Sequence, residues 1–455
     1  MAKQITYQPL KDLGLNGLNT QSNPATLDHS WLTKAENIVL RESGRIAFRK
    51  GLKQKVAPSD TAIGSMVEHN DQGTNKIFAS YGTSIYTVDF TSPASAFPTG
   101  DVDTMHTVSG SSGDWQFVNF NNRLHCFHEG IVPQRYDGAL GSGSKWAAFD
   151  NSTKPSGVTD FDPSCGMGYY GRMFVGGVTE EKDVVHYSVL LDSDDFTGTG
   201  SGLIDLKKVW GTDEIVNIAA FFGKLIIFGK KNIAIYDTPA DIANATLDEV
   251  ISGIGLVHRD TVQAVGDDLV FLSDTGLRSL SRTTEKDKLP LTDYSLNIKD
   301  TLIRHIGLST NVRSIYVENE GVYILSFIDK NITYTFDFKH FTPNKAPRVT
   351  TWSFDLDREP ASMAYTKLYS GLLVGQKDGS IAGYEGYHDI DLAWDSGVSY
   401  TNASYASNIS SVWINLGEGV QSAIIKRMIL VLEGGSGSVL SLRWYKDFSG
   451  SSSAE

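Results

Sequence analysis

The chain has 455 residues, of which 40% are hydrophobic and 20% charged, and its formal net charge is −13. One hydrophobic core usually serves about 250–300 residues at most, so this length predicts two domains or a repeat architecture. The acidic balance argues against a protein that grips nucleic acid by neutralising phosphates, because that mode needs clustered Lys and Arg. It does not argue against a surface that DNA merely passes.

The composition also limits the cellular context. The 44 Gly residues against 13 Pro indicate many tight turns, as in a strand-rich protein. Cys126 and Cys165 are too few for a disulfide framework, so we expect two buried free thiols. The N-terminus lacks the apolar core of a signal peptide, and no uncharged apolar run approaches the ~18 residues of a membrane helix. We therefore expect synthesis in the cytosol.

Residues 1–58 form a first segment that does not match the pattern of the rest of the chain. Asp28 is a suitable cap for a short helix that would run through Glu36. The stretches NIVL (37–40) and RIAF (45–48) follow, separated by a turn at 42–44, and their alternation predicts a β-hairpin.

A repeated pattern occupies the middle of the chain. FGKLIIFGKKNIAIYD (222–237) illustrates it: a turn, a short apolar run, a second turn and a second apolar run. Seven such units follow one another at spacings of 47, 49, 52, 44, 53 and 50 residues, counted between the residues that begin their first apolar runs: Ile77, Leu124, Met173, Leu225, Leu269, Val322 and Leu372.

Each unit contains enough chain for four strands, because strand-like segments such as 114–120 and 214–221 precede the repeated hairpin. A period of 40–50 residues with about four strands is the signature of a propeller blade, and a lone hairpin cannot bury its own apolar face. We predict an all-β fold with a β-propeller of six or seven blades; the alternative is a β-sandwich with coincidental spacing. No stretch keeps apolar residues at helical spacing over a dozen residues, apart from a weak candidate at 296–307.

The C-terminal part again departs from the repeat, with strand-like runs at 410–417 and 425–448. We expect the two ends of the chain to meet in a second β-rich platform domain. The predicted division is 1–58 for the N-terminal part of the platform, 59–390 for the propeller and 391–455 for the C-terminal part of the platform.

No motif predicts catalysis, a cofactor or a metal. His125 and His128 lie three apart on a predicted strand and point to opposite faces, which does not suit one ion. Acidic stretches at 192–196 and 353–360 lack the spacing of a calcium loop and are interpreted as solvated turns. SDTGLRSL (273–280) lacks the Trp of a sialidase Asp-box and predicts a simple hairpin turn.

Four stretches occur in an order that suggests a family: GLN…NPATL…AENIVL…RKG within 17–51, HYSVLLDSDDFTGTGSGLIDL (186–206), IVNIAAFFGKLIIFGKKNIAIYD (215–237) and GLVHRDTVQAVGDDLVFLSDTGLRSLSR (255–282). Together they resemble the nozzle, or tail tubular protein B, family of short-tailed bacteriophages. Family members usually continue past the residues that correspond to 442–455, so we expect a shortened or absent distal tip.

The resemblance implies a structural protein of the virion tail, made in the host cytoplasm and not inserted in a membrane. It implies a homo-hexameric ring below the portal and the adaptor (tail tube) protein. The ring would conduct and gate the genome during ejection, with double-stranded DNA passing through it without specific binding, and it would also support the docking of tail fibres. A closed ring needs two different complementary surfaces on each subunit, and we expect acidic rather than basic side chains to face the bore.

The candidate ring or adaptor interface comprises five residues of the N-terminal segment: Trp31, Asn37, Arg45, Arg49 and Lys50. The alternative for the three basic residues is a solvated turn, since surface ion pairs often contribute little.

Two other functions are compatible with the repeat. One is a tail-associated, carbohydrate-active propeller enzyme, which would need convergent carboxylates and exposed aromatic residues; Trp115, Trp146, Trp210 and Trp352 are the candidates. The other is a general propeller scaffold, which leaves the terminal strands unexplained.

Overall fold

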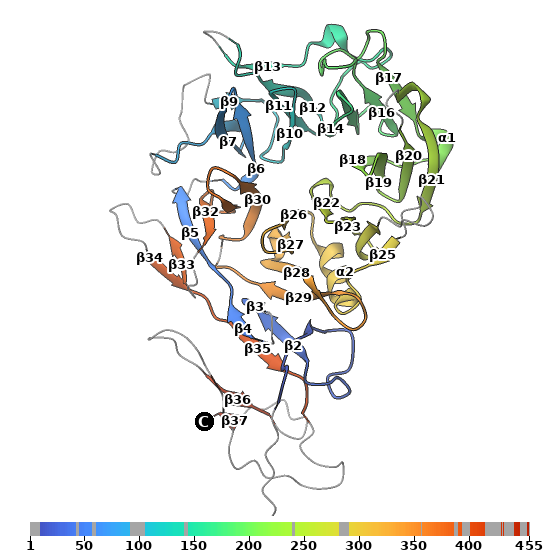
Figure 1. Cartoon of the computed structure of the whole chain (residues 1–455). Coiled ribbons are helices and arrows are strands. Elements are labelled where there is room, and N and C mark those ends of the chain that lie inside the picture. Colours follow the sequence, from blue (N-terminus) through green and yellow to red (C-terminus); the bar gives the residue numbers. More distant parts are fainter. Residues whose placement is uncertain are drawn as a thin grey trace, which may run out of the picture.

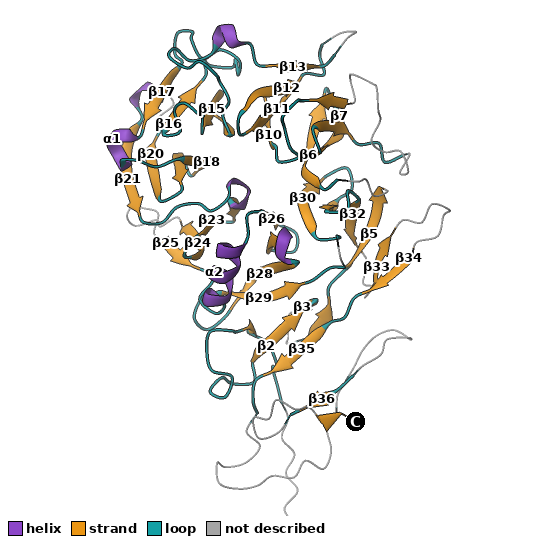
Figure 2. Cartoon of the chain, turned by 180° about the vertical axis from the view of Figure 1, so that it is seen from behind, coloured by secondary structure: helices purple, strands orange, loops and turns teal. Residues whose placement is uncertain are grey.

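The computed structural model describes residues 10–41, 45–56, 61–91, 105–140, 144–238, 242–281, 291–355, 357–385, 390–393, 401–414, 429, 431, 441–445 and 453–454. Most of them lie in strands, which are arranged as sheets around a common centre (Figure 1). Helices are few and short, as Figure 2 shows. The predicted β-propeller is therefore confirmed.

Five sheets of four antiparallel strands follow one another along the chain. In order they comprise β6 (Ile63–Asp71), β7 (Thr74–Tyr81), β8 (Ser84–Thr87) and β9 (Met105–Thr107); β10 (Gln116–Phe120), β11 (Arg123–His128), β12 (Ile131–Tyr136) and β13 (Trp146–Ala148); β14 (Cys165–Tyr169), β15 (Arg172–Gly176), β16 (Val184–Tyr187) and β17 (Gly202–Asp205); β18 (Ile215–Phe221), β19 (Lys224–Gly229), β20 (Asn232–Asp237) and β21 (Thr246–Ser252); and β22 (Gln263–Val265), β23 (Asp268–Ser273), β24 (Gly276–Ser281) and β25 (Leu291–Asp293).

A sixth four-stranded blade is completed by the N-terminal segment. The strands β30 (Pro360–Thr366), β31 (Gly371–Gln376) and β32 (Ile381–Glu385) take β5 (Gly51–Val56) as their fourth strand. The chain then runs from β5 into β6 of the first blade, and β30 packs against β6. The first and last blades are thus joined by a strand from the other end of the chain, which closes the ring.

A larger sheet lies between the fifth blade and this closing blade. It begins with β26 (Val312–Val317), β27 (Val322–Phe327), β28 (Ile332–Phe341) and β29 (Pro347–Trp352), and its first strand contacts β22 and β30. Beyond β29 the sheet continues outside the ring through β1 (Gly17–Leu18), β2 (Trp31–Glu36) and β35 (Asn408–Ser411).

Strands from both ends of the chain form this extension, as the sequence predicted. β2 pairs in parallel with β1 and antiparallel with β35. The predicted hairpin is present as β3 (Ile38–Leu40) and β4 (Ile46–Phe48). The closing blade is likewise extended by β33 (Ile390–Ala393) and β34 (Thr401–Ser404), while β36 (Arg443–Trp444) and β37 (Ser453–Ala454) pair with each other. Of the strand-like runs predicted at 410–417 and 425–448, residues 410–411 lie in β35 and 443–444 in β36, and most of the remainder falls outside the described residues.

The hydrophobic core is divided among the junctions between neighbouring sheets. One apolar cluster, for example, joins Phe174 of β15 to Ile227 of β19, and the next joins Phe228 of β19 to Phe271 of β23. A further cluster joins the N-terminal Leu32 to Leu325 of the larger sheet. Because the second strand of a sheet is buried on both faces, its sequence is a nearly continuous run of apolar residues.

The predicted repeat agrees with the structure residue by residue. The residues that define the spacing lie in the second strand of successive sheets, namely β7, β11, β15, β19, β23, β27 and β31. The predicted helix at 296–307 corresponds to α2 (Lys299–Leu308), which buries Leu302 and Ile306. Both cysteines are buried and free.

The helix predicted from Asp28 to Glu36 is wrong. The carboxylate of Asp28 accepts from the backbone N of Ser30 at 2.8 Å, but it stabilises a turn. The residues after this turn form strand β2, which pairs with β1 and β35 and buries Trp31, Leu32 and Ala35. This long-range pairing and burial outweigh the local preference for a helix.

The remaining helical elements are short connections: α1 (Lys207–Trp210) and the 3₁₀ turns η3 (Asn151–Thr153), η4 (Ile242–Asn244), η5 (Arg259–Thr261) and η6 (Ile328–Lys330). Within the described part of the chain, no helix is both long enough and apolar enough to span a membrane.

Candidate functional site

The first strand of each sheet faces the centre of the ring, where the structure has a cavity of about 240 Å³. Its walls come from β6, β10, β18, β22, β26 and β30 and from η5. Polar side chains, including Gln116, Asn217, Gln263 and Ser314, are prominent among the residues that line it. The centre of the propeller therefore combines a cavity with polar side chains, as a binding site would.

An ion-paired group, which we term the axial clasp, joins segments from different blades next to this cavity. It consists of Asp114, just before β10, Arg259 in η5 and Arg313 in β26. One carboxylate oxygen of Asp114 accepts from Arg259 Nη2 at 2.7 Å and from Arg313 Nη2 at 2.9 Å. A single carboxylate thus ties the second blade to two sheets that lie later in the chain.

Backbone carbonyl groups complete the clasp. Arg259 donates from Nη2 to the carbonyl of Asp114 at 2.7 Å and from Nη1 to that of Ser164 at 3.0 Å. Arg313 donates from Nε to the carbonyl of Gly64 at 3.4 Å. Both arginines are more than nine-tenths buried, and their contacts reach five of the sheets around the ring.

A chain of neutral hydrogen bonds continues from the clasp around the centre. Asn217 donates to the carbonyl of Arg259 at 2.7 Å and accepts from Gln116 at 3.3 Å. Gln116 in turn accepts from the backbone N of Gly166 at 2.8 Å. The first strands are consequently linked through side chains as well as through apolar packing.

The electrostatics keep Asp114 ionised. Burial alone would raise the pKa of its carboxyl group, but the guanidinium groups of Arg259 and Arg313 outweigh this effect and lower the pKa to about 2. A carboxyl group with this pKa is not a general acid at neutral pH, because a general acid must hold its proton until the reaction.

Asp114, His258 and Asp260 bring three possible metal ligands within 4.8 Å of one another. Arg259 and Arg313, however, already donate to Asp114 and lie 3.4 and 3.6 Å from the carboxylate oxygens of Asp260. A cation would have to displace two guanidinium groups that are themselves buried. The residues present fit an internal salt bridge better than a metal centre.

His258 lies beside the clasp, in contact with Arg313. Burial lowers its pKa below the ordinary value for histidine, although the Asp260 carboxylate acts in the opposite direction. Its Nε2 atom lies 3.1 Å from Arg313 Nη1 and accepts a hydrogen bond from it. The carboxylates of Asp114 and Asp260 together balance the positive charges of Arg259 and Arg313.

The sequence did not single out the residues of the clasp. The available signal was the presence of charged residues at the start of first strands, in DWQFV (114–118), HRDTV (258–262) and NVRSI (311–315). Nothing in the spacing showed that these positions, up to 199 residues apart, would converge on one carboxylate.

The structure brings three of the predicted interface residues together, but within the chain. Arg49 is fully buried, and its Nε donates to Asn37 Oδ1 at 3.2 Å. Asn37 is 1% exposed and also donates to the carbonyl of Ala406 at 2.9 Å. Lys50 forms an ion pair with Glu320. Asn37 and Arg49 therefore join the two terminal segments of one subunit.

The other two predicted interface residues lie apart from this junction. Trp31 is 8% exposed in β2, whereas Arg45 is exposed beside the β3–β4 hairpin. The role of the five residues in contacts between subunits stays a prediction.

Three of the four tryptophans considered as sugar-binding surfaces are buried: Trp115, Trp146 and Trp352. The sequence SDTG (273–276) forms the predicted β-hairpin turn, in which Ser273 pairs with Gly276 and Gly276 has a φ of 124°. In the acidic stretch 192–196, Asp194 pairs with Arg123 at 3.2 Å and also with Arg135. These features are accounted for by packing and turn formation.

Comparison with known proteins adds no family to this description. No protein-family model matches the chain, and no curated protein matches it.

Proposed function

We propose that the chain is a structural subunit of a short bacteriophage tail, which assembles with copies of itself into a ring below the adaptor. The observation that carries this proposal is the extension outside the ring, in which β1 and β2 from the N-terminus pair with β29 and with β35 from the C-terminal part. The residues 17–51 that resemble the nozzle family contribute to this extension and to the closing blade.

The interior of the propeller supports a mechanical role. The axial clasp and the closing strand β5 both add connections between blades that lie far apart in the chain. Such connections stiffen a body that must transmit force, and the two arginines of the axial clasp line the central cavity, where an enzyme would hold its substrate. A genome would then pass through a channel formed between subunits, outside the propeller.

The alternative carbohydrate-active enzyme has no specific observation in its favour. Of the carboxylates near the central cavity, Asp114 is ionised and bound by two arginines, and Asp260 faces the same two guanidinium groups. A glycosidase needs one carboxyl group that retains its proton and one that is free to attack or to activate water. We propose no enzymatic activity.

The test is the composition of purified virus particles from the source of this gene. Quantitative mass spectrometry should detect the chain at about half the copy number of the portal protein, as expected for a ring of six beside a portal of twelve. Absence from particles would overturn the proposal. An equal or much larger copy number would rule out the six-subunit ring while keeping the chain in the virion.

A further inference from the structure

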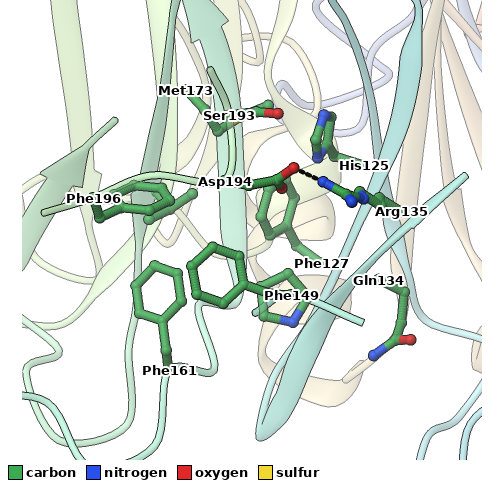
Figure 3. Close-up of a pocket in the computed structure, with 12 residues that line it drawn as sticks. His125, Phe127, Gln134, Arg135, Phe149, Phe161, Met173, Ser193, Asp194 and Phe196 are labelled. Carbon is green, nitrogen blue, oxygen red and sulfur yellow. Dashed lines mark ion pairs between the residues drawn. The ribbon is translucent and has the colours of Figure 1, made fainter. Parts of the chain in front are cut away.

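A small pocket lies at the junction of the second and third blades. It has a volume of about 10 Å³, and most of its wall is apolar, including the rings of Phe127, Phe149, Phe161 and Phe196. Figure 3 shows the polar residues His125, Ser193, Asp194 and Arg135 gathered on one side of the pocket, with Phe149, Phe161 and Phe196 on the other.

Three buried polar atoms at this pocket have no hydrogen-bond partner among the described residues. They are Nε2 of His125, Oγ of Ser193 and Nε of Arg135. His125 and Ser193 are each 4% exposed, so bulk solvent does not satisfy them. A buried polar group without a partner is destabilising, and three such atoms around one pocket point to a shared ligand.

The size and charge of the pocket restrict this ligand. A volume of about 10 Å³ is roughly that of a single water-sized probe. Arg123 and Arg135 are balanced by Asp137 and Asp194, through contacts that include 2.8 Å from Arg123 Nε to Asp137. A cation would meet Arg135 Nε, which can only donate, and an anion would meet the carboxylate of Asp194.

We propose that this pocket binds one structural water molecule that links the second blade to the loop between β16 and β17. The water accepts a hydrogen bond from Arg135 Nε and exchanges hydrogen bonds with His125 Nε2 and Ser193 Oγ. A water with three protein partners is the usual way in which a buried polar pocket is satisfied.

The water adds to other contacts that attach this loop to its neighbours. Phe196 donates from its backbone N to the carbonyl of Thr153 at 3.0 Å, and its ring packs on Phe149 and Phe161. Asp194 binds both arginines of the second blade. The loop is thereby attached to the second blade through an ion pair, an aromatic cluster and, in this proposal, a solvent bridge.

A crystal structure that resolves ordered solvent tests the proposal directly. The expected result is one peak within about 2.7–3.2 Å of all three atoms. A crystal equilibrated with xenon gas should show no xenon here, because dry apolar cavities bind xenon whereas polar ones hold water. Xenon in the pocket, or a direct hydrogen bond between His125 and Ser193 with no peak, would overturn the proposal.

A pair of serine variants provides the control. Ser193→Ala removes one partner, so the solvent peak should disappear or move away from position 193. Ser188→Ala should leave the peak in place, because the Ser188 hydroxyl bonds to the backbone of Met173 and Val189 instead. A peak that is unchanged in Ser193→Ala would contradict the assigned role of Ser193.

Discussion

The guanidinium group of Arg49 lies over the ring of Tyr405, 3.7 Å from its centroid, and so holds together segments that are 356 residues apart. The hydroxyl of Tyr405 also donates a hydrogen bond to the backbone carbonyl of Arg49 at 2.6 Å. The ring of Phe354 lies 4.9 Å from the same guanidinium group. Cation–π contacts with two aromatic rings in a buried position make Arg49 the centre of the junction between the chain ends.

Replacement of Arg49 should destabilise this junction. We expect Arg49→Ala to lower the free energy of unfolding by about 3 kcal/mol, because it removes two cation–π contacts and one of the two donors to Asn37 Oδ1, leaving only the backbone N of Ser353. Arg49→Lys should cost about 2 kcal/mol, since an ammonium group cannot stack as a plane. Urea denaturation measures both. The exposed Arg45→Ala should change the free energy by less than about 0.5 kcal/mol; equal effects at both positions would contradict the buried role.

The axial clasp should make stability depend on pH in the acid range. Its carboxyl group, Asp114, has a pKa of about 2 in the folded protein, below the ordinary value of 3.8. The stability it contributes is therefore complete above about pH 4 and is lost as the pH falls towards 2. Because 40% of the side chain is exposed, solvent screening limits this contribution to about 1 kcal/mol.

The variant Asp114→Asn isolates this effect. It should lower the urea midpoint at pH 7, and the difference from the wild type should shrink steadily below pH 4. Asp160→Asn, at an exposed position, is the control and should follow the wild type at every pH. A difference that stays constant down to pH 2 would show that Asp114 acts through shape rather than through its charge.

The sequence predicts the repeated part of this fold well, because a blade depends mainly on local patterns. A short apolar run between turns, such as 225–228, is a strand signal, and in the structure it lies in the buried second strand of its sheet. The weak helical pattern before residue 308 was also sufficient to predict α2. In these segments the local preference and the tertiary environment agree.

The local sequence pattern does not predict pairings between strands that are far apart in the chain, and these pairings determine the rest of the structure. Nothing near Asp28 indicates that residues 31–36 will find a partner at 408–411, so the local helix signal gave the wrong element. β5 looked like part of a separate platform but completes the last blade. The clasp depends on three charged residues whose convergence is set by the ring as a whole.

His125 should produce a second pH dependence, in a different window. Burial and the nearby arginines, Arg123 and Arg135, lower its pKa from 6.5 to about 3, so the folded protein disfavours the charged imidazole. Stability from this residue is complete above about pH 6.5 and declines as the pH falls towards 3, by about 1.4 kcal/mol for each pH unit. In His125→Gln the free energy of unfolding should fall less steeply between pH 6 and pH 4 than in the wild type. Identical slopes would contradict the prediction.

The closing strand β5 should be essential for the stability of the ring. Lys53 lies in its middle, opposite Gly383 of β32 on one side and Leu392 of β33 on the other. Proline at a position with neighbours on both sides removes a donor and does not fit a central strand, so Lys53→Pro should lower the free energy of unfolding by about 3 kcal/mol or more. Lys53→Ala keeps the backbone and should cost less than about 1 kcal/mol. Limited proteolysis adds a local readout, because release of β5 should expose the last blade to cleavage before the other blades. If Lys53→Pro unfolds at the same urea concentration as Lys53→Ala, the ring does not depend on closure by β5.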